Sequence, residues 1–259
     1  MKRTIALFAI AAVFAGCQKD KNEEAEKKDA VLEFSTKTYE KKTALPCKAS
    51  PCAEVKIAVP EASGIPVVSD SINKKIFNTV RGIVYFGEKP SNGKNYEEVM
   101  ATFISSYEQL KEEYEDERSG WEANIDGKVT YSSDKILNIK LHSYTFTGGA
   151  HGYDASRSLI FDKATGKSLE KNDILKDTVA FKVLAEKKFR EKFKIPSGKP
   201  INSTGMMFMK EVFELPQTYF FTAQGLLLYY NIYEAAAYAE GPKEVLIPYS
   251  EAGKFLKVK

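Results

Sequence analysis

The sequence predicts an α+β fold in which antiparallel sheets carry helices packed on one side. Two observations support this class: segments with apolar residues at helical spacing are separate from segments that alternate with period two, and turn residues divide the alternating segments. Residues 31–259 are long enough for two small domains. We therefore expect two intimately associated subdomains, an N-terminal α+β domain at 31–150 and a C-terminal α+β domain at 151–259.

The N-terminal half begins with two expected strands within residues 30–58, on either side of the segment PCKASPC. A helix should follow, with Ser69 or Asp70 as its N-cap. Its predicted buried stripe consists of Ile72, Ile76, Phe77, Val80 and Val84. A second helix should run from Tyr96 to about Asp116, and its predicted apolar side consists of Val99, Phe103, Ile104, Tyr107 and Tyr114.

Three antiparallel strands are expected next, at residues 121–133, 135–149 and 153–167. The turn signals are Asp126-Gly127, residues 132–134 and Thr165-Gly166. A third helix should have Asp177 or Thr178 near its N-cap and end before Ile195-Pro196. The remaining chain predicts a short helical turn within 206–215, a hairpin about residues 223–225, a strand at 243–250 and a terminal helical turn.

The N-terminus reads as an export signal at residues 1–17, because Lys2 and Arg3 precede a short apolar run that is too short to span a membrane. Phe14-Ala15-Gly16-Cys17 resembles the lipobox of bacterial lipoproteins, which implies lipidation at Cys17. Residues 18–30 are charged and lack aromatic residues, so we expect a disordered tether. The protein should be lipid-anchored in the cell envelope, either periplasmic or exposed on the outer membrane.

Cysteine usage agrees with export. Cys47 and Cys52 lie close enough in sequence to form a small disulfide-closed loop, which leaves Cys17 for lipidation. The alternative, a zinc site, needs about four ligands, whereas the chain has only two histidines, His142 and His151. We expect a disulfide, no metal and no cofactor.

The charge balance argues against a nucleic-acid partner. Loss of Lys2 and Arg3 leaves 36 basic residues against 35 acidic ones, and nucleic-acid binding requires a strong basic excess. Contact with a membrane is expected only through the lipid anchor.

The stretch TFTGGAHGY, residues 145–153, interrupts the strands and is the candidate binding corner. Gly148 and Gly149 permit positive φ and a close backbone approach, and His151 with Tyr144 and Tyr153 could add polar contacts. The pattern favours the simpler interpretation that the same residues form a tight corner with a histidine hydrogen-bonded to the backbone. A further candidate is Tyr233, because strand alternation would place it on one face with Tyr229 and Asn231.

A catalytic role for His151 is the alternative to binding. Ser143 or Ser156 could serve as its nucleophile, but the nucleophile-elbow pattern G-x-S-x-G does not occur in the sequence. Glu234 and Asp154 could also be imagined as a pair of glycosidase carboxylates, although nothing in the sequence sets their separation.

Several stretches resemble a paired set of bacterial domains of unknown function. They are the motif Tyr-x-x-x-Gly-Gly-Ala-His-Gly at residues 144–152, the element LIFDKATGK and the closing strands YFFTAQGLLLYYNIYEAAAYAEGPKEVLIPYSE. The same pair forms the extracytoplasmic part of a lysozyme-sensing anti-sigma factor and occurs beside the catalytic domain of some peptidoglycan deacetylases. The resemblance implies an α+β fold whose later half is similar to a small subdomain of actin-like chaperone ATPases.

The resemblance also implies recognition of a cell-wall-related partner, either a lysozyme-like protein or peptidoglycan. Neither signalling nor deacetylation carries over, because no segment resembles a sigma-binding region or a deacetylase catalytic domain. The hypothesis from sequence is a non-enzymatic binding or sensing module of the cell envelope. The alternative is an envelope hydrolase or cell-wall-modifying enzyme that uses His151.

Overall fold

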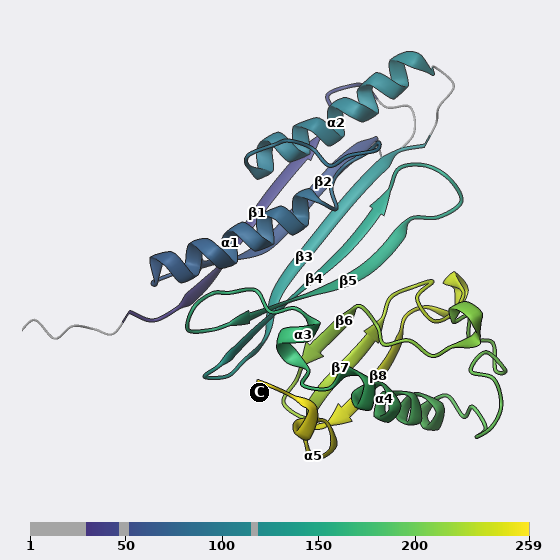
Figure 1. Ribbon diagram of the computed structural model, residues 1–259. Helices are drawn as coiled ribbons and strands as arrows, with labels where there is room; N and C mark the ends of the chain where they lie inside the picture. Colours follow the sequence, from purple (N-terminus) through teal and green to yellow (C-terminus); the bar gives the residue numbers. More distant parts are fainter. Residues whose placement is uncertain (1–29, 47–51, 115–118, 259) are drawn as a thin grey trace, which may run out of the picture. The chain divides into compact units, whose positions relative to one another are not determined.

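The computed structural model describes residues 30–46, 52–114 and 119–258. The chain divides into two units, residues 1–30 and 31–259, and the description below concerns the second (Figure 1). Its strands form two sheets, accompanied by helices, so the predicted α+β class is confirmed. Cys17 and Cys47 lie outside the described residues, and lipidation and the Cys47–Cys52 disulfide stay predictions.

The first sheet has five strands in the order of the sequence. These are β1 (Glu33–Lys42), β2 (Ala53–Ser63), β3 (Trp121–Ser132), β4 (Ile136–Phe146) and β5 (Tyr153–Asp162). All neighbouring strands are antiparallel except β2 and β3, which are parallel. Parallel strands need a long crossover, and here the connection contains both helices of the N-terminal half. The sequence did not predict this parallel pair.

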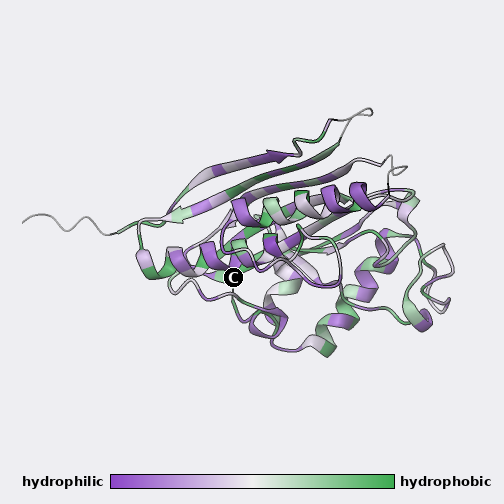
Figure 2. Cartoon of the chain, turned by 90° about the horizontal axis from the view of Figure 1, so that it is seen from above, coloured by the Kyte–Doolittle hydropathy of each residue, from purple (hydrophilic) through white to green (hydrophobic). Residues whose placement is uncertain are grey.

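Helices α1 (Pro66–Arg81) and α2 (Tyr96–Glu113) pack on one side of β1 and β2 (Figure 1). Their hydrophobic and hydrophilic residues alternate along each helix (Figure 2), as the predicted stripes require. Most stripe residues are buried, but Tyr114 is exposed and is the C-cap of α2, so its place on the apolar side was wrong.

The predicted start of the first helix was also wrong. Pro66 occupies its first turn, and Ile65 is the N-cap, without a side-chain hydrogen bond. Proline suits this position because its fixed φ fits the helix and its missing N–H would have no partner there. Ser69 is a buried residue inside α1 rather than its cap.

β3 runs unbroken through Asp126-Gly127, so these residues are not a turn. A Cβ on Gly127 would lie 2.7 Å from Leu141 Cδ2 and 2.9 Å from Pro60 Cδ. Glycine is used here for close packing between strands, which a sequence reading cannot distinguish from a turn signal.

The second sheet has three antiparallel strands, and the predicted hairpin about residues 223–225 is confirmed. Its strands are β6 (Thr218–Phe221), β7 (Gly225–Tyr230) and β8 (Lys243–Pro248). The helical elements around it are α3 (Lys171–Ile174), α4 (Thr178–Lys192), η1 (Met209–Glu211), η2 (Tyr238–Glu240), α5 (Tyr249–Ala252) and η3 (Gly253–Phe255). Asp177 caps α4 as predicted, accepting from the N–H of Ala180.

Two hydrophobic cores meet through β4 and β5. Leu159 and Phe161 belong to the core under α1 and α2, whereas Ile136 and Ile160 belong to the core around α4 and the second sheet. β5, which follows the expected division after residue 150, thus pairs with β4 and contributes to both cores.

Buried polar groups also join the two sheets. The side-chain oxygen of Asn138, fully buried on β4, accepts a hydrogen bond from the N–H of Phe221 on β6 at 2.8 Å. This bond ties the second sheet to the first near the start of β4, at the end of the strand away from residues 146–153.

Candidate functional site

The connection between β4 and β5 forms the corner that contains the glycine pair. Gly148 and Gly149 have φ of +102° and +92°, which a side chain would strain. A Cβ on Gly152 would lie 2.5 Å from Tyr144 Cζ, so the Tyr144 ring covers the backbone there. The sequence therefore uses the first two glycines for backbone conformation and the third for contact with Tyr144.

His151 lies between two tyrosines from the C-terminal half. Its Nε2 is 3.1 Å from Tyr233 Oη, and its ring stacks on Tyr238 with 3.9 Å between centroids and 21° between planes. Nδ1 is 3.1 Å from the carbonyl oxygen of Gly152. A carbonyl only accepts, so Nδ1–H donates to it, and Nε2 is within hydrogen-bond distance of the Tyr233 hydroxyl, which can donate or accept.

The turn after β7 positions Tyr233. Asn231 clasps the backbone of Ser156 on β5: its Oδ1 accepts from the Ser156 N–H at 2.7 Å, and its Nδ2 donates to the Ser156 carbonyl at 3.1 Å. Tyr233 itself has φ of +66°, an uncommon conformation for a non-glycine residue. These two hydrogen bonds from the Asn231 side chain hold the turn against β5 of the first sheet.

Glu234 closes the same turn. Its carboxylate accepts from the N–H of Gln217 at 2.6 Å and from the N–H of Asn231 at 2.9 Å. Burial raises the pKa of Glu234, and these two backbone donors oppose the shift. These hydrogen bonds indicate that Glu234 stabilises the turn.

Tyr144 and the histidine of β4 extend the polar surface along the first sheet. Burial raises the pKa of Tyr144, and the carboxylates of Glu122 and Asp154 together with Tyr238 raise it further. Asp154, the cross-strand partner of Tyr144, has its Oδ2 2.8 Å from His142 Nε2. His142 therefore connects the corner with the side of the sheet that faces away from α1 and α2.

The structure brings together some of the predicted residues and separates others. Tyr144, His151 and Tyr233 meet at the corner, where Gly148 and Gly149 shape the backbone. Tyr153 is exposed but alternates with Asp154, so it lies on the opposite face of the sheet from Tyr144.

The expected alternation of Tyr229, Asn231 and Tyr233 in one strand was wrong, because β7 ends at Tyr230 and a turn follows. Tyr238 and the clasp by Asn231 were missed. Tyr238 belongs to the tyrosine-rich stretch that marks this region in the sequence, but no local pattern reveals a contact across 87 residues.

The serines considered as nucleophiles make other contacts. Ser143 is buried, its hydroxyl donates to the Ala155 carbonyl at 3.3 Å, and it accepts from Arg157 at 3.2 Å. Ser156 is fully buried, and its contact with Asn231 is made by the backbone of Ser156 rather than by its hydroxyl. The hydrogen bonds of His151 go to Tyr233 and Gly152.

Among the residues that the structure describes, no group of three or more His, Cys, Asp or Glu side chains is placed to hold a metal ion. Within the same ranges, no helix combines the length and the apolar composition of a membrane span.

Two family models match the chain. Residues 46–154 match a model described as deacetylase PdaC, and residues 169–250 match a model described as a protein of unknown function, DUF3298. The chain thus carries the paired domains that its sequence resembles. The pair indicates an extracytoplasmic module associated with the cell envelope.

Solved structures show the same fold. A DUF3298 family member from Bacteroides fragilis superposes with a TM-score of 0.67 at 21% identity, covering 88% of this chain and 94% of its own. A DUF3298 family protein from Pseudomonas aeruginosa superposes with a TM-score of 0.62 at 21% identity and the same coverage. No curated protein matches the chain significantly.

Proposed function

We propose that the protein is a lipid-anchored, non-enzymatic binding or sensing module of the cell envelope. Its partner is a cell-wall-related molecule, either a lysozyme-like protein or a peptidoglycan fragment. It binds this partner through the aromatic corner, which we define as Tyr144, residues 148–152, Tyr233 and Tyr238.

The observation that carries the proposal is the exposed His151 held between a tyrosine hydroxyl and a tyrosine ring. Tyr233 keeps 54% of its surface exposed although its hydroxyl is already oriented. Rigid, partly exposed aromatic side chains provide contact area at a low entropy cost, which suits recognition of protein loops and sugars. The pairing with a PdaC-type domain supports a cell-wall-related partner.

Titration calorimetry on residues 18–259 tests the proposal, using a c-type lysozyme and soluble peptidoglycan fragments at low and high salt. Lysozyme is basic, so we expect true recognition to persist when salt screens nonspecific attraction. Gly149→Val should abolish binding, because valine is strained at φ +92° although its Cβ would meet nothing within 4 Å.

The matched control is Gly205→Val. Gly205 has φ of +91° and equally open surroundings, but it lies in the loop before η1 rather than at the corner. Binding lost in both variants, or retained in both, would contradict recognition by the corner. Turnover of a peptidoglycan fragment that disappears in His151→Ala would instead support the enzymatic alternative.

The anchor has a separate test. Cys17→Ala should move the protein from the membrane fraction to the soluble fraction of cells, while leaving binding by the purified chain unchanged. Retention of the variant in the membrane fraction would contradict lipid anchoring at Cys17.

A further inference from the structure

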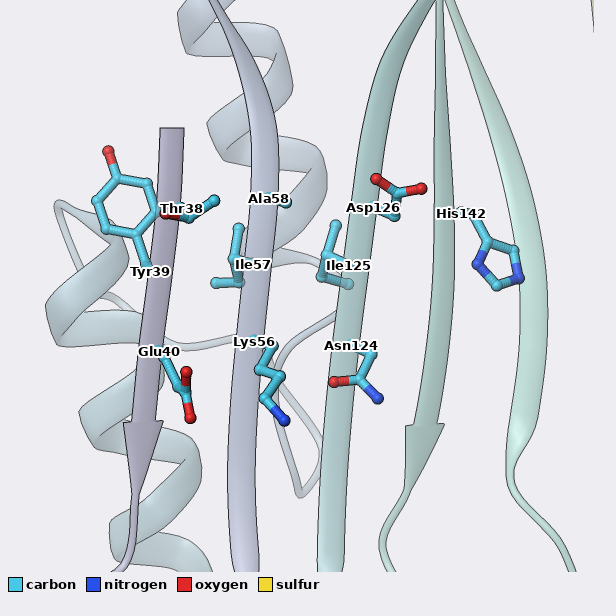
Figure 3. A pocket seen from close by; sticks show the side chains of 10 residues that line it. All are labelled: Thr38, Tyr39, Glu40, Lys56, Ile57, Ala58, Asn124, Ile125, Asp126 and His142. Carbon is cyan, nitrogen blue, oxygen red and sulfur yellow. The ribbon is translucent and has the colours of Figure 1, made fainter. Parts of the chain in front are cut away.

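A groove crosses the side of the first sheet that faces away from α1 and α2 (Figure 3). Its volume is about 530 Å³, within the range of about 300–1,000 Å³ typical of small-molecule sites. Thr38, Ala58, Asp126 and His142 occupy one row of cross-strand neighbours from β1 to β4. The small side chain of Ala58 leaves the hollow in the middle of that row.

A second row of neighbours borders the groove. Glu40, Lys56 and Asn124 are aligned across β1, β2 and β3, and all three side chains line the hollow (Figure 3). His142 lies at the far end of the first row, where its ring meets Asp154. The groove therefore leads toward the aromatic corner along the same sheet face.

The charges beside the groove are already paired with one another. Lys42 lies 3.0 Å from Glu40 and 3.1 Å from Glu54, and Lys56 lies 2.6 Å from Glu54. The hydrogen bond from Lys56 is the main cause that lowers the pKa of Glu54. A charged ligand would have to compete with these pairs, whereas a neutral polar ligand can use the free lone pairs and protons that remain.

Asp126 also forms an ion pair. Lys128 lies 2.6 Å from Asp126 Oδ2, and about half of the Asp126 side chain stays exposed. The carboxylate therefore retains lone pairs that can accept from hydroxyl groups of a ligand.

Asn124 provides a polar atom without a partner. Its Nδ2 donates to Glu122 Oε1, while its Oδ1 is buried and accepts no hydrogen bond from the described residues. A buried acceptor without a donor is costly and calls for an additional partner. A hydroxyl or amide group of a ligand in the groove supplies one once the Asn124 side chain turns this oxygen toward the hollow.

We propose that this groove binds a neutral saccharide rich in hydroxyl and amide groups. The ligand donates to Asn124 Oδ1 and to the exposed carboxylates of Glu40 and Asp126, and it fills the hollow over Ala58. The proposal rests on the proposed function and deepens it by naming a glycan-binding groove beside the aromatic corner.

The test is calorimetric titration of residues 18–259 with a tetramer of N-acetylglucosamine, which is neutral, and a tetramer of glucosamine, which is cationic. We expect the neutral tetramer to bind equally well at about 50 mM and about 300 mM salt, because no net charge is exchanged. Preference for the cationic tetramer, with loss of binding at high salt, would overturn the proposal.

Ala58→Phe fills the groove, and an aromatic residue on an exposed strand face is compatible with the sheet. We expect the affinity for the neutral tetramer to fall about tenfold or more. The matched control is Thr36→Phe, an exposed position two residues from Thr38 on the same face of β1, which should bind normally. Equal affinity of the two variants would overturn the proposal.

Asn124→Leu tests the acceptor independently, because it keeps the volume and removes Oδ1. We expect a similar loss of affinity with an unchanged unfolding midpoint, whereas unchanged affinity would contradict the role of Asn124. Gly149→Val separates the two proposals: it should remove lysozyme binding by the corner and leave tetramer binding in place. If Ala58→Phe binds the tetramer normally while Gly149→Val loses the corner partner, the groove proposal fails and the proposed function stands.

Discussion

Replacing Asn231 with alanine should detach the turn that carries Tyr233. The Asn231 amide is the only described side chain that bonds both the N–H and the carbonyl of Ser156. Ser156 is fully buried, so after Asn231→Ala its N–H has no ready access to water. The carbonyl keeps a long bond from Thr218 Oγ1 at 3.4 Å.

The expected cost follows from these two bonds. An unsatisfied buried N–H costs about 1–3 kcal/mol, and losing the second bond costs about 1 kcal/mol more. We therefore expect the free energy of unfolding to fall by about 2–4 kcal/mol. Urea denaturation at neutral pH, followed by circular dichroism, measures this difference.

The control is Asn73→Ala. Asn73 makes the same two-bond clasp on the backbone of Ala62, at 2.8 and 2.9 Å, but it belongs to α1 and Ala62 lies in the core under α1 and α2, apart from the turn that carries Tyr233. Stacking on Tyr238 should shift the ring-proton NMR signals of His151, and only Asn231→Ala should move them toward free-histidine positions. A stability loss below about 0.5 kcal/mol, or equal changes in the His151 signals of both variants, would refute the reasoning.

Three further predictions concern the fold that holds the site. Hydrogen bonds from the hydroxyl and from the N–H of Thr165 are the main causes that lower the pKa of Asp162. The ionised carboxylate therefore stabilises the fold above about pH 4, and this contribution is lost as the pH falls through the pKa of Asp162 in the folded protein. Asp162→Ala should thus cost about 1–2 kcal/mol at pH 7 and little at low pH, as measured by urea denaturation at each pH. Asn138→Leu should cost about 2–4 kcal/mol because it orphans the buried N–H of Phe221 and also removes the hydrogen bond from Asn138 Nδ2 to Ser158 Oγ, and a change below about 1 kcal/mol in the same assay would contradict this. Gly127→Val should lower the thermal midpoint at a cost of about 1–3 kcal/mol by overpacking β3 against its neighbours, and an unchanged midpoint would count against it.

Local sequence patterns predicted most of the elements because each pattern has a local physical cause. The helix at Thr178–Lys192 was placed by its Asp177 cap, and the hairpin about residues 223–225 by its turn residues. Features that depend on contacts between distant segments could not be predicted from local patterns. The parallel pairing of β2 with β3 depends on where α1 and α2 pack, and the glycine at 127 reports a contact with another strand.

The candidate site was predicted in part for the same reason. The glycine pair and His151 stand out within one short stretch, because tandem glycines predict unusual backbone. Tyr233 was proposed from a strand alternation that does not exist, and the structure brings it to His151 through a turn instead. Neither Tyr238 nor the groove over Ala58 has a local signature, because both arise from contacts between distant segments.

The aromatic corner depends on the pairing of the two domains. His151 lies within the residues matched by the PdaC model, whereas Tyr233 and Tyr238 lie within those matched by the DUF3298 model. The clasp of Asn231 on Ser156 and the bond from Phe221 to Asn138 join the two sheets. Because each domain supplies only part of the corner, we expect the proposed binding there to require both, and separating the domains should eliminate it even if each part folded alone. The groove over Ala58, by contrast, is lined entirely by residues from the first sheet. When the two domains are separated, we therefore expect binding at the aromatic corner to be lost and binding in the groove to be retained.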